Sequence, residues 1–200
     1  MDAIAWATSA MIAARERVTV AAGNLANVST SAFQRRVATG SLGERGVVLR
    51  TSIGEQRGAL QRTGRPLDLA IVGAGAFQVM DANGHLVSTR GGSFERTPEG
   101  KLVDMQGRVL FGTCGAVILP EGASIEADGN VRSGGAIHNH LALPAGSRVQ
   151  TGFIETSAVN AIDEMVAMLA AQRSYESAQK VVTAIDGVRQ KSSSDVARLK

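Results

Sequence analysis

Apolar residues near the start of the chain recur with the period of a helix that packs against a partner. Two sets of positions repeat every seven residues, the second set three positions after the first: Ile4, Met11, Val18 and Leu25, then Ala7, Ala14, Ala21 and Val28. This spacing is the a/d seam of a coiled coil. Because a seam of small side chains buries too little surface to offset the entropy of ordering an isolated helix, the segment is predicted to need a partner.

The end of the chain carries a second apolar stripe, which makes it the candidate partner helix. Its members recur at i, i+3, i+4 and i+7: Ile162, Val166 and Leu169, then Ala178, Val181, Val182, Ile185 and Val188. Two arrangements fit this pattern. The helices close on each other within one molecule as a hairpin around the rest of the chain, or their stripes are completed only between subunits.

The middle of the chain has the pattern of antiparallel β-structure. Tight-turn pairs such as Asn83-Gly84 and Gln106-Gly107 separate short apolar or alternating runs, and no stretch is long enough for a crossover helix. The stretches 40–64 and 134–146 are expected to be irregular, with one strand near 47–49 in the first. The candidate strands are Leu67–Val72, Phe77–Met80, Leu86–Thr89, Leu102–Val103, Val109–Phe111 and Val117–Leu119.

These patterns predict an α+β fold in three consecutive parts. Residues 1–39 form the N-terminal helix of a coiled-coil core, residues 40–151 form a central antiparallel β domain, and residues 152–200 form the C-terminal helix of the core. All four prolines lie between residues 66 and 144, inside the predicted β domain. The two ends are therefore predicted to be helical without interruption.

Composition narrows the classes of partner. The chain has 200 residues and a net charge of +3, with no run of Lys and Arg interleaved with aromatic residues, so we expect no nucleic-acid binding. No apolar stretch approaches 18 residues and no signal-peptide pattern opens the chain, so we expect neither membrane insertion nor a cleaved signal. Cys114 is the only cysteine and is predicted to be a small buried hydrophobe.

One segment imitates a nucleotide-binding motif, which keeps a soluble cofactor-binding enzyme as the competing class. Ala70–Gly75 resembles the strand and first two glycines of a dinucleotide fingerprint, but Gln78 stands at the third glycine and a strand-like run follows where a helix should begin. We therefore predict a tight turn between two strands, with Gly73 and Gly75 present for their backbone freedom, and no bound cofactor.

Other candidate chemistry is incomplete. His138 and His140 share a face of an extended segment, but no third metal ligand is evident nearby. Ser93 lacks the second glycine of a nucleophile elbow, and only His85, His138 and His140 are available as its base. No pair of carboxylates stands out. We therefore predict no catalytic residues, no metal site and no enzymatic activity.

Four segments stand out in a fixed order along most of the chain. They are Asn24–Thr30 with Phe33–Arg35, Arg65–Ile71 with Gly73 and Gly75, Thr89–Phe94 with Gly100–Val103, and Gly152–Ser157 with Glu164–Val166 and Gln172–Glu176. In order and spacing, these segments resemble the axial rod and hook family of the bacterial flagellum. Within that family, the stretches Arg65–Asp68 and Pro120–Gly129 are similar to proximal rod proteins more than to hook proteins.

The resemblance implies a structural subunit without catalysis. Members of the family pair their terminal helices as an inner coiled-coil layer, carry the β domain outside, and stack helically into a shaft that transmits torque from the motor to the hook. They are exported through the flagellar type III apparatus, which implies a place in the basal body without a cleaved signal peptide. The implied partners are further copies and other rod and hook subunits, and a distal rod or hook subunit stays open as the alternative.

The sequence departs from the family pattern at a few positions. Ala32 stands where the family usually has Gly, and the stretch 134–149 is shorter than in relatives, which puts contacts made by that portion in doubt. Asn24 and Asn27 are expected either to end the first helix or to contact a neighbouring subunit. The candidate assembly interface is Ile4, Met11, Val18, Leu25, Asn24, Asn27, Ile162, Val166, Leu169, Val182 and Ile185.

Overall fold

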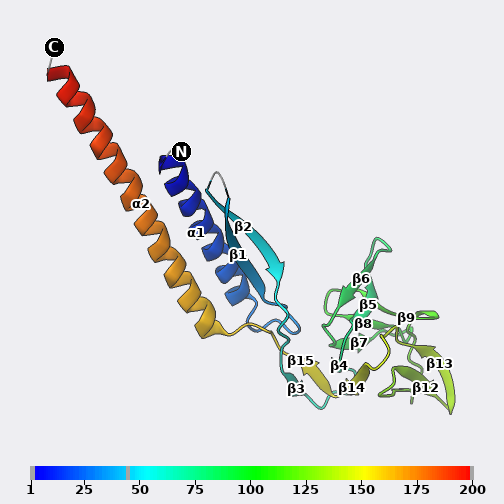
Figure 1. Ribbon diagram of the computed structural model, residues 1–200. Helices are drawn as coiled ribbons and strands as arrows, with labels where there is room; N and C mark the ends of the chain where they lie inside the picture. The colour runs from blue at the N-terminus through cyan, green and yellow to red at the C-terminus, as the bar shows by residue number, and fades with distance from the viewer. Residues whose placement is uncertain (1–2, 44–45, 199–200) are drawn as a thin grey trace. The chain divides into compact units, whose positions relative to one another are not determined.

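Figure 1 shows a computed structural model, which describes residues 3–43 and 46–198, with side chains up to residue 192. Helix α1 (Ala3–Ala26) opens it and helix α2 (Ala161–Arg198) closes it. The strands between them are β1 Arg36–Gly43, β2 Gly46–Ile53, β3 Leu60–Arg62, β4 Leu69–Val72, β5 Phe77–Met80, β6 Leu86–Thr89, β7 Phe94–Arg96, β8 Leu102–Asp104, β9 Val109–Gly112, β10 Gly115–Ala116, β11 Ser124–Ile125, β12 Asn130–Ser133, β13 Ala136–His140, β14 Arg148–Thr151 and β15 Phe153–Glu155.

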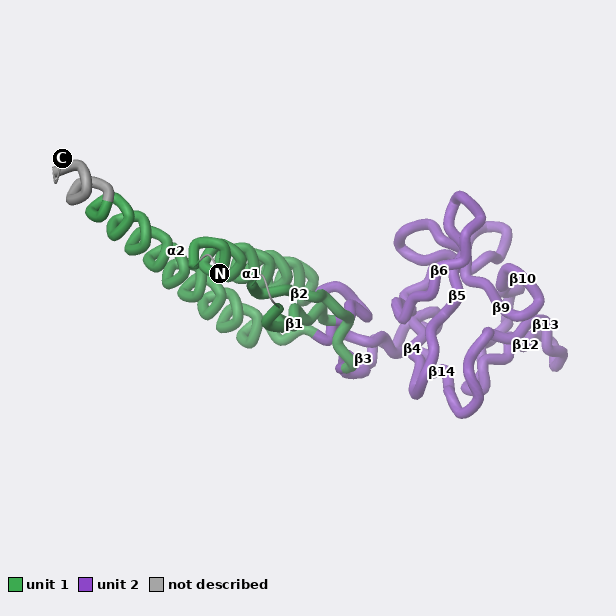
Figure 2. Tube along the Cα trace, turned by 45° about the horizontal axis from the view of Figure 1, so that its top comes forward, with its two compact units in different colours: residues 1–28, 35–55, 159–200 green, residues 29–34, 56–158 purple. Residues whose placement is uncertain are grey.

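The chain forms two compact units that do not follow one another along the sequence (Figure 2). Unit 1 contains residues 1–28, 35–55 and 159–200, and unit 2 contains residues 29–34 and 56–158. The structure thus groups residues 40–55 with the helices, where the sequence pattern placed them at the start of the β domain. The physical reason is docking on α1, where the backbone N–H of Val47 donates a hydrogen bond of 3.1 Å to Ser9 Oγ.

Unit 1 consists of the two helices and one long hairpin. Strands β1 and β2 pair antiparallel from Arg36 opposite Ile53 to Gly43 opposite Gly46. The expectation of an irregular stretch with a single strand at 47–49 was therefore wrong. Strand β1 has the sequence RVATGSLG, whose glycines and small polar residues do not give the apolar pattern of a strand. It forms because it pairs with β2 and packs on α1, which its own sequence does not indicate.

Helix α2 begins with a recognisable cap. Asn160 Oδ1 accepts a hydrogen bond of 3.0 Å from the backbone N–H of Ile162, and Asp163 and Glu164 place acidic groups in the first turn. Both features stabilise the amino-terminal end of a helix, whose first N–H groups lack partners within the helix. Within the described ranges, neither helix has the length and apolarity that a membrane span requires.

Unit 2 is the antiparallel β domain that the sequence predicts. Its largest sheet has the order β6-β5-β9-β8-β7 with β10 paired to β9, and smaller sheets are formed by β11-β12-β13, β14-β4 and β15-β3. Two local expectations differ from the structure. The stretch 134–146, expected to be irregular, contains β13, and the strand expected at Val117–Leu119 is reduced to a single bridge between Lys101 and Ile118.

The core of unit 2 is built from large apolar side chains. Phe77 and Phe94 meet edge to face, with ring centroids 5.6 Å apart and an interplanar angle of 89°. Around them lie Leu69, Ile71, Val79, Leu102, Leu110, Val117, Leu119, Ile125, Val131, Leu141 and Val149. The turn between β4 and β5 carries Gly73 and Gly75 at φ of 104° and 97°, which confirms the tight turn predicted for the segment that imitates a nucleotide-binding motif.

Candidate assembly interface

The predicted seam of α1 lies against α2 as far as Leu25, whereas its last predicted member, Val28, lies beyond the helix and is 37% exposed. Val18 lines a cavity with Tyr175, and Ala7 lines another with Ala178, so the two helices run antiparallel. Figure 1 shows the same opposed directions. Ala7, Ala14 and Ala21 of the predicted seam are buried, whereas Ile4, Met11, Val18 and Leu25 are partly buried.

Helix α2 buries a set of residues that differs in part from the set that its apolar pattern suggests. Glu164, Ala171 and Ala178 are buried, seven residues apart, and Val182 and Ile185 are partly buried further along. The larger apolar residues at the start of the helix, Ile162, Val166 and Leu169, are exposed. The sequence pattern included Ala178, Val182 and Ile185, but it overlooked Glu164 and Ala171, because Ala and Glu contribute little to a hydrophobic pattern.

The large apolar residues of α2 form an exposed face, which we name the outer stripe. It comprises Ile162, Met165, Val166 and Leu169, with exposed fractions of 70%, 51%, 60% and 55%. Their spacing of three, four and seven residues puts them on one side of the helix, opposite the buried Glu164 and Ala171. Single exposed apolar residues are ordinary in proteins, but a contiguous exposed group of four marks a candidate interaction surface.

A buried polar cluster joins α1, β1 and α2. Asn24 Nδ2 donates to the carbonyl oxygen of Arg36 at 2.8 Å and to Glu164 Oε2 at 3.1 Å, and the Arg36 N–H donates to Asn24 Oδ1 at 2.9 Å. The second carboxylate oxygen of Glu164 accepts from Arg35 Nε. Asn24 and Glu164 are each only 1% exposed. A carboxylate buried to this degree requires such partners, so the cluster fixes which turns of the two helices lie opposite each other.

The two asparagines at the end of α1 have different roles. Asn27 lies one residue beyond the helix and its Nδ2 donates to the carbonyl oxygen of Gly23 at 2.8 Å, which is the helix-ending role expected for it. Asn24 lies inside the helix and contacts β1 and α2, so its role is to connect these elements and not to end the helix. Sequence reasoning missed this role because Asn24 and Glu164 are 140 residues apart in the chain.

The structure shows the surroundings of several side chains that were considered for chemistry. Ser93 Oγ donates to Asp68 Oδ1 at 2.9 Å, and the described residues contain no group of three or more His, Cys, Asp or Glu side chains placed to hold a metal. Cys114 is exposed, so the prediction of a buried cysteine was wrong. It lies in the turn between β9 and β10, where its N–H donates to Asn139 Oδ1 at 3.2 Å.

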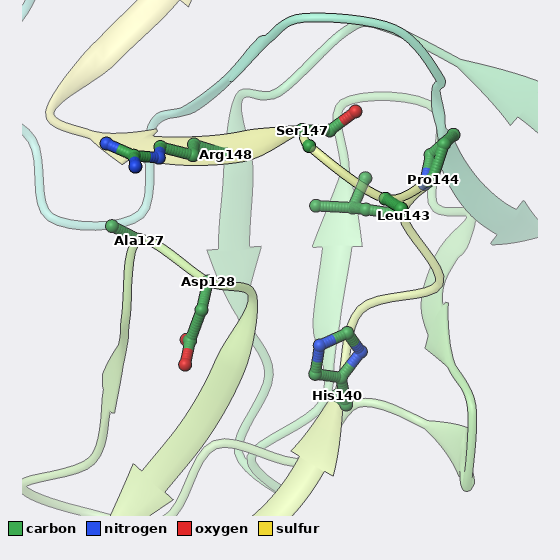
Figure 3. Close-up of a pocket in the computed structure, with 9 residues that line it drawn as sticks. Ala127, Asp128, His140, Leu143, Pro144, Ser147 and Arg148 are labelled. Carbon is green, nitrogen blue, oxygen red and sulfur yellow. The ribbon is translucent and has the colours of Figure 1, made fainter.

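One cavity of unit 2 is lined in part by polar side chains, of which Asp128 has a local structural role. This cavity of about 460 Å³ is lined by Asp128, His140 and Arg148, among others, and Figure 3 shows these three side chains spaced around it. The Asp128 carboxylate accepts a 3.0 Å hydrogen bond from the N–H of Asn130 and so caps a turn. At another hairpin, the N–H of His85 lowers the pKa of the Asp81 carboxyl below its ordinary value, which keeps it an anion that caps the turn.

Comparison with known proteins covers most of the chain. Residues 4–38 match the family described as flagella basal body rod protein, residues 70–133 match the flagellar hook protein FlgE/F/G D1 domain, and residues 150–195 match the flagellar basal body rod FlgEFG protein C-terminal family.

Among similar proteins, flagellar basal-body rod protein FlgF of Escherichia coli (strain K12) is 30% identical, over 84% of this chain and 87% of the relative. FlgF of Salmonella typhimurium is 28% identical over the same shares. Flagellar basal-body rod protein FlgG of Agrobacterium fabrum is 26% identical, over 93% of this chain and 96% of the relative.

Proposed function

Because the chain belongs to the family of flagellar basal-body rod proteins, we propose that it assembles helically through its terminal helices into the drive shaft that transmits torque to the hook. Membership of this family makes it a structural rod subunit and not an enzyme. The observation that carries this proposal is the outer stripe of α2. Ile162, Val166 and Leu169 are exposed in the single chain. Burying them against a neighbouring subunit gives assembly a hydrophobic driving force.

Closure within one molecule and closure between subunits, the two arrangements considered for the apolar stripes, then apply to different faces of the helices. The seam of α1 with Val182 and Ile185 of α2 closes within one molecule, as a coiled-coil hairpin. The outer stripe closes between molecules, in a heterologous contact that repeats along a filament. We accordingly propose that Ile162, Val166 and Leu169 make the contact between subunits. The other predicted interface residues hold the two helices in place within one chain; they are Ile4, Met11, Val18, Leu25, Val182, Ile185, Asn24 and Asn27.

Membership of the rod family implies assembly with other flagellar rod and hook subunits and a location in the basal-body rod. We propose in addition that the chain is exported by the flagellar type III apparatus without a cleaved signal peptide. The FlgF and FlgG names of its relatives support a rod position over the hook alternative. The turn at Gly73 and Gly75, between β4 and β5, speaks against the alternative of a nucleotide-binding enzyme.

Replacing Leu169 by Asp in the full chain tests the proposal. The aspartate is solvated in the free chain but loses its hydration in an apolar contact between subunits, so rod assembly and motility are expected to be lost while the purified chain stays folded. Motility in soft agar, isolation of basal bodies and hydrogen exchange of the purified protein measure the three properties.

A conservative variant at the same position is the control. Leu169→Met keeps an apolar side chain of similar volume, so rods and motility are expected to persist. Motile cells carrying Leu169→Asp, with rods of normal composition, would contradict the proposal. Loss of folding in the purified Asp variant would instead assign Leu169 to the stability of the single chain.

A further inference from the structure

All four passages of the chain between the two units adjoin three short stretches of unit 2, and these stretches are hydrogen bonded to one another. We name them together the junction: residues 29–34, 56–62 and 153–158. The N–H of Ala32 donates to the carbonyl oxygen of Glu155 at 2.9 Å, and the N–H of Ala158 donates to that of Phe33 at 3.0 Å. Strand β15 pairs with β3, and Thr156 N–H donates to the carbonyl oxygen of Ala59 at 2.9 Å.

The junction is closely packed along its backbone. A Cβ atom at Gly58 would lie 1.8 Å from the carbonyl oxygen of Thr156, so no side chain fits where these two stretches cross. Ala32 has a φ of 56°, a left-handed conformation that costs a non-glycine residue energy and persists only where surrounding contacts enforce it. Both features indicate that the three stretches are built to hold one arrangement.

One buried side chain ties this junction to the β core. Arg90 Nε lies 2.7 Å from Glu155 Oε2, and the side chains of Arg90 and Glu155 are 7% and 3% exposed. On its other side, Arg90 Nη2 donates to the carbonyl oxygen of Ile71 at 2.8 Å and Nη1 to that of Gly75 at 2.6 Å. A planar guanidinium spreads five donors over three nitrogens, so it can reach a carboxylate and carbonyl groups that lie on different sides of it, whereas an ammonium has three donors on a single nitrogen.

We propose that Arg90 is a positioning residue that holds the junction and the β core of unit 2 together as one rigid body. Glu155 is the common partner, because its carboxylate binds Arg90, its carbonyl group binds residues 29–34 and its strand pairs with β3. The purpose of this rigidity rests on the proposed function, because a subunit of a shaft that transmits torque must resist deformation. Its structural content concerns the single chain.

Hydrogen exchange of the purified chain, read by mass spectrometry, tests this role. In Arg90→Lys the charge stays but the fork is lost, so amides of the junction and of residues 71–75 are expected to exchange at least about tenfold faster, while amides of β5, β8 and β9 change less than about twofold. Arg90→Met, which also removes the charge, is expected to give a larger effect in the same segments. Unchanged exchange in the junction, or equal acceleration of junction and core in Arg90→Lys, would overturn the proposal.

Arg132→Lys is the matched control. Arg132 Nε also lies 2.7 Å from a carboxylate oxygen, of Glu126, and its Nη1 donates to a backbone carbonyl, of Gly135, but all three groups belong to neighbouring turns of the chain. Its variant is expected to leave exchange in the junction unchanged. Acceleration of the junction by this control would assign the Arg90 effect to general loss of stability. Because this test uses the free chain, it can fail while Leu169→Asp still abolishes rod assembly, and the reverse also holds.

Discussion

The two units bury different kinds of side chain. Unit 2 has a core of large side chains, in which Phe77, Phe94, Leu102 and Leu110 are at most 1% exposed, although other large residues such as Met105 lie in solvent. The fully buried apolar residues of unit 1 are mostly alanines, and several of its large residues, among them Ile162 and Leu169, lie in solvent. Exposed large apolar side chains on α2 leave a face of unit 1 available for contact with other molecules. The comparison teaches that unit 2 forms a core of large side chains within one chain, whereas unit 1, in the proposed assembly, buries its outer stripe only when subunits meet.

The energetic consequence follows from the sizes of the buried groups. Fully burying a Phe or Leu side chain contributes about 1.5–3 kcal/mol, whereas an alanine methyl contributes about 0.8 kcal/mol on the same scale. The helix pair therefore depends on fixed polar contacts and on docking of the β1–β2 hairpin as well as on its seam. Such a unit can persist before assembly and still keep a hydrophobic driving force for it.

Removing a core side chain of unit 2 gives the largest change in stability that the comparison predicts. Phe94→Ala deletes a fully buried ring that packs edge to face on Phe77, and is expected to cost about 3–5 kcal/mol. Hydrogen exchange at the amides of β5 and β9 in the purified chain measures the loss. A cost below about 1 kcal/mol would mean that unit 2 is not held by this core.

Breaking the polar cluster of unit 1 gives the next effect. Asn24→Ala leaves the N–H and carbonyl groups of Arg36 without their side-chain partners and takes a donor from Glu164, so unit 1 is expected to lose about 2 kcal/mol. The only tryptophan, Trp6, lies on α1, and its fluorescence during urea unfolding reports on this unit. Asn27→Ala, at the end of the same helix, serves as the comparison and is expected to cost less.

Relieving the strained residue of the junction is expected to stabilise unit 2. Ala32→Gly removes the steric cost of φ at 56° and keeps the N–H that donates to Glu155, for a gain of about 1 kcal/mol. Exchange rates in residues 29–34 should fall. Faster exchange there would show that the alanine methyl group makes a contact worth more than the strain.

The smallest effect on the free chain is expected at the outer stripe. Leu169→Ser changes a side chain that is 55% exposed, so the stability of unit 1 is expected to stay within about 0.5 kcal/mol. Urea unfolding followed by Trp6 fluorescence measures it. A loss above about 1.5 kcal/mol would place Leu169 within the fold of the single chain and remove the contrast between the units.

Periodicity carried the sequence predictions that the structure confirms. The β pattern between residues 67 and 111 marks strands β4, β5, β6, β8 and β9, but not β7, because apolar side chains recur along these strands and their turns carry glycine. The hairpin of β1 and β2 escaped prediction because glycine, serine and threonine dominate the first strand. On α2, the buried positions Glu164 and Ala171 were not predicted, because alanine and glutamate contribute little to an apolar pattern, whereas Ala178 was part of the predicted stripe.

Long-range polar contacts could not be predicted at all. Arg90 and Glu155 were recognised as parts of two family segments, but they are 65 residues apart and nothing in either segment specifies the other. The same holds for Asn24 and Glu164. Each pair forms only because the fold of the intervening chain brings two buried groups together. A single sequence shows that both residues are present but not that they lie close in space.

The accessibility of the outer stripe in assembled rods tests the central claim most directly. A Val166→Cys variant in a Cys114→Ser background carries one thiol, at a position that is 60% exposed in the free chain. The account predicts that a maleimide labels this thiol at least about tenfold more slowly in isolated rods than in the free chain, and that dissociating the rods restores the rate, because the core of a subunit interface excludes solvent. Equal labelling in rods and in the free chain would contradict it.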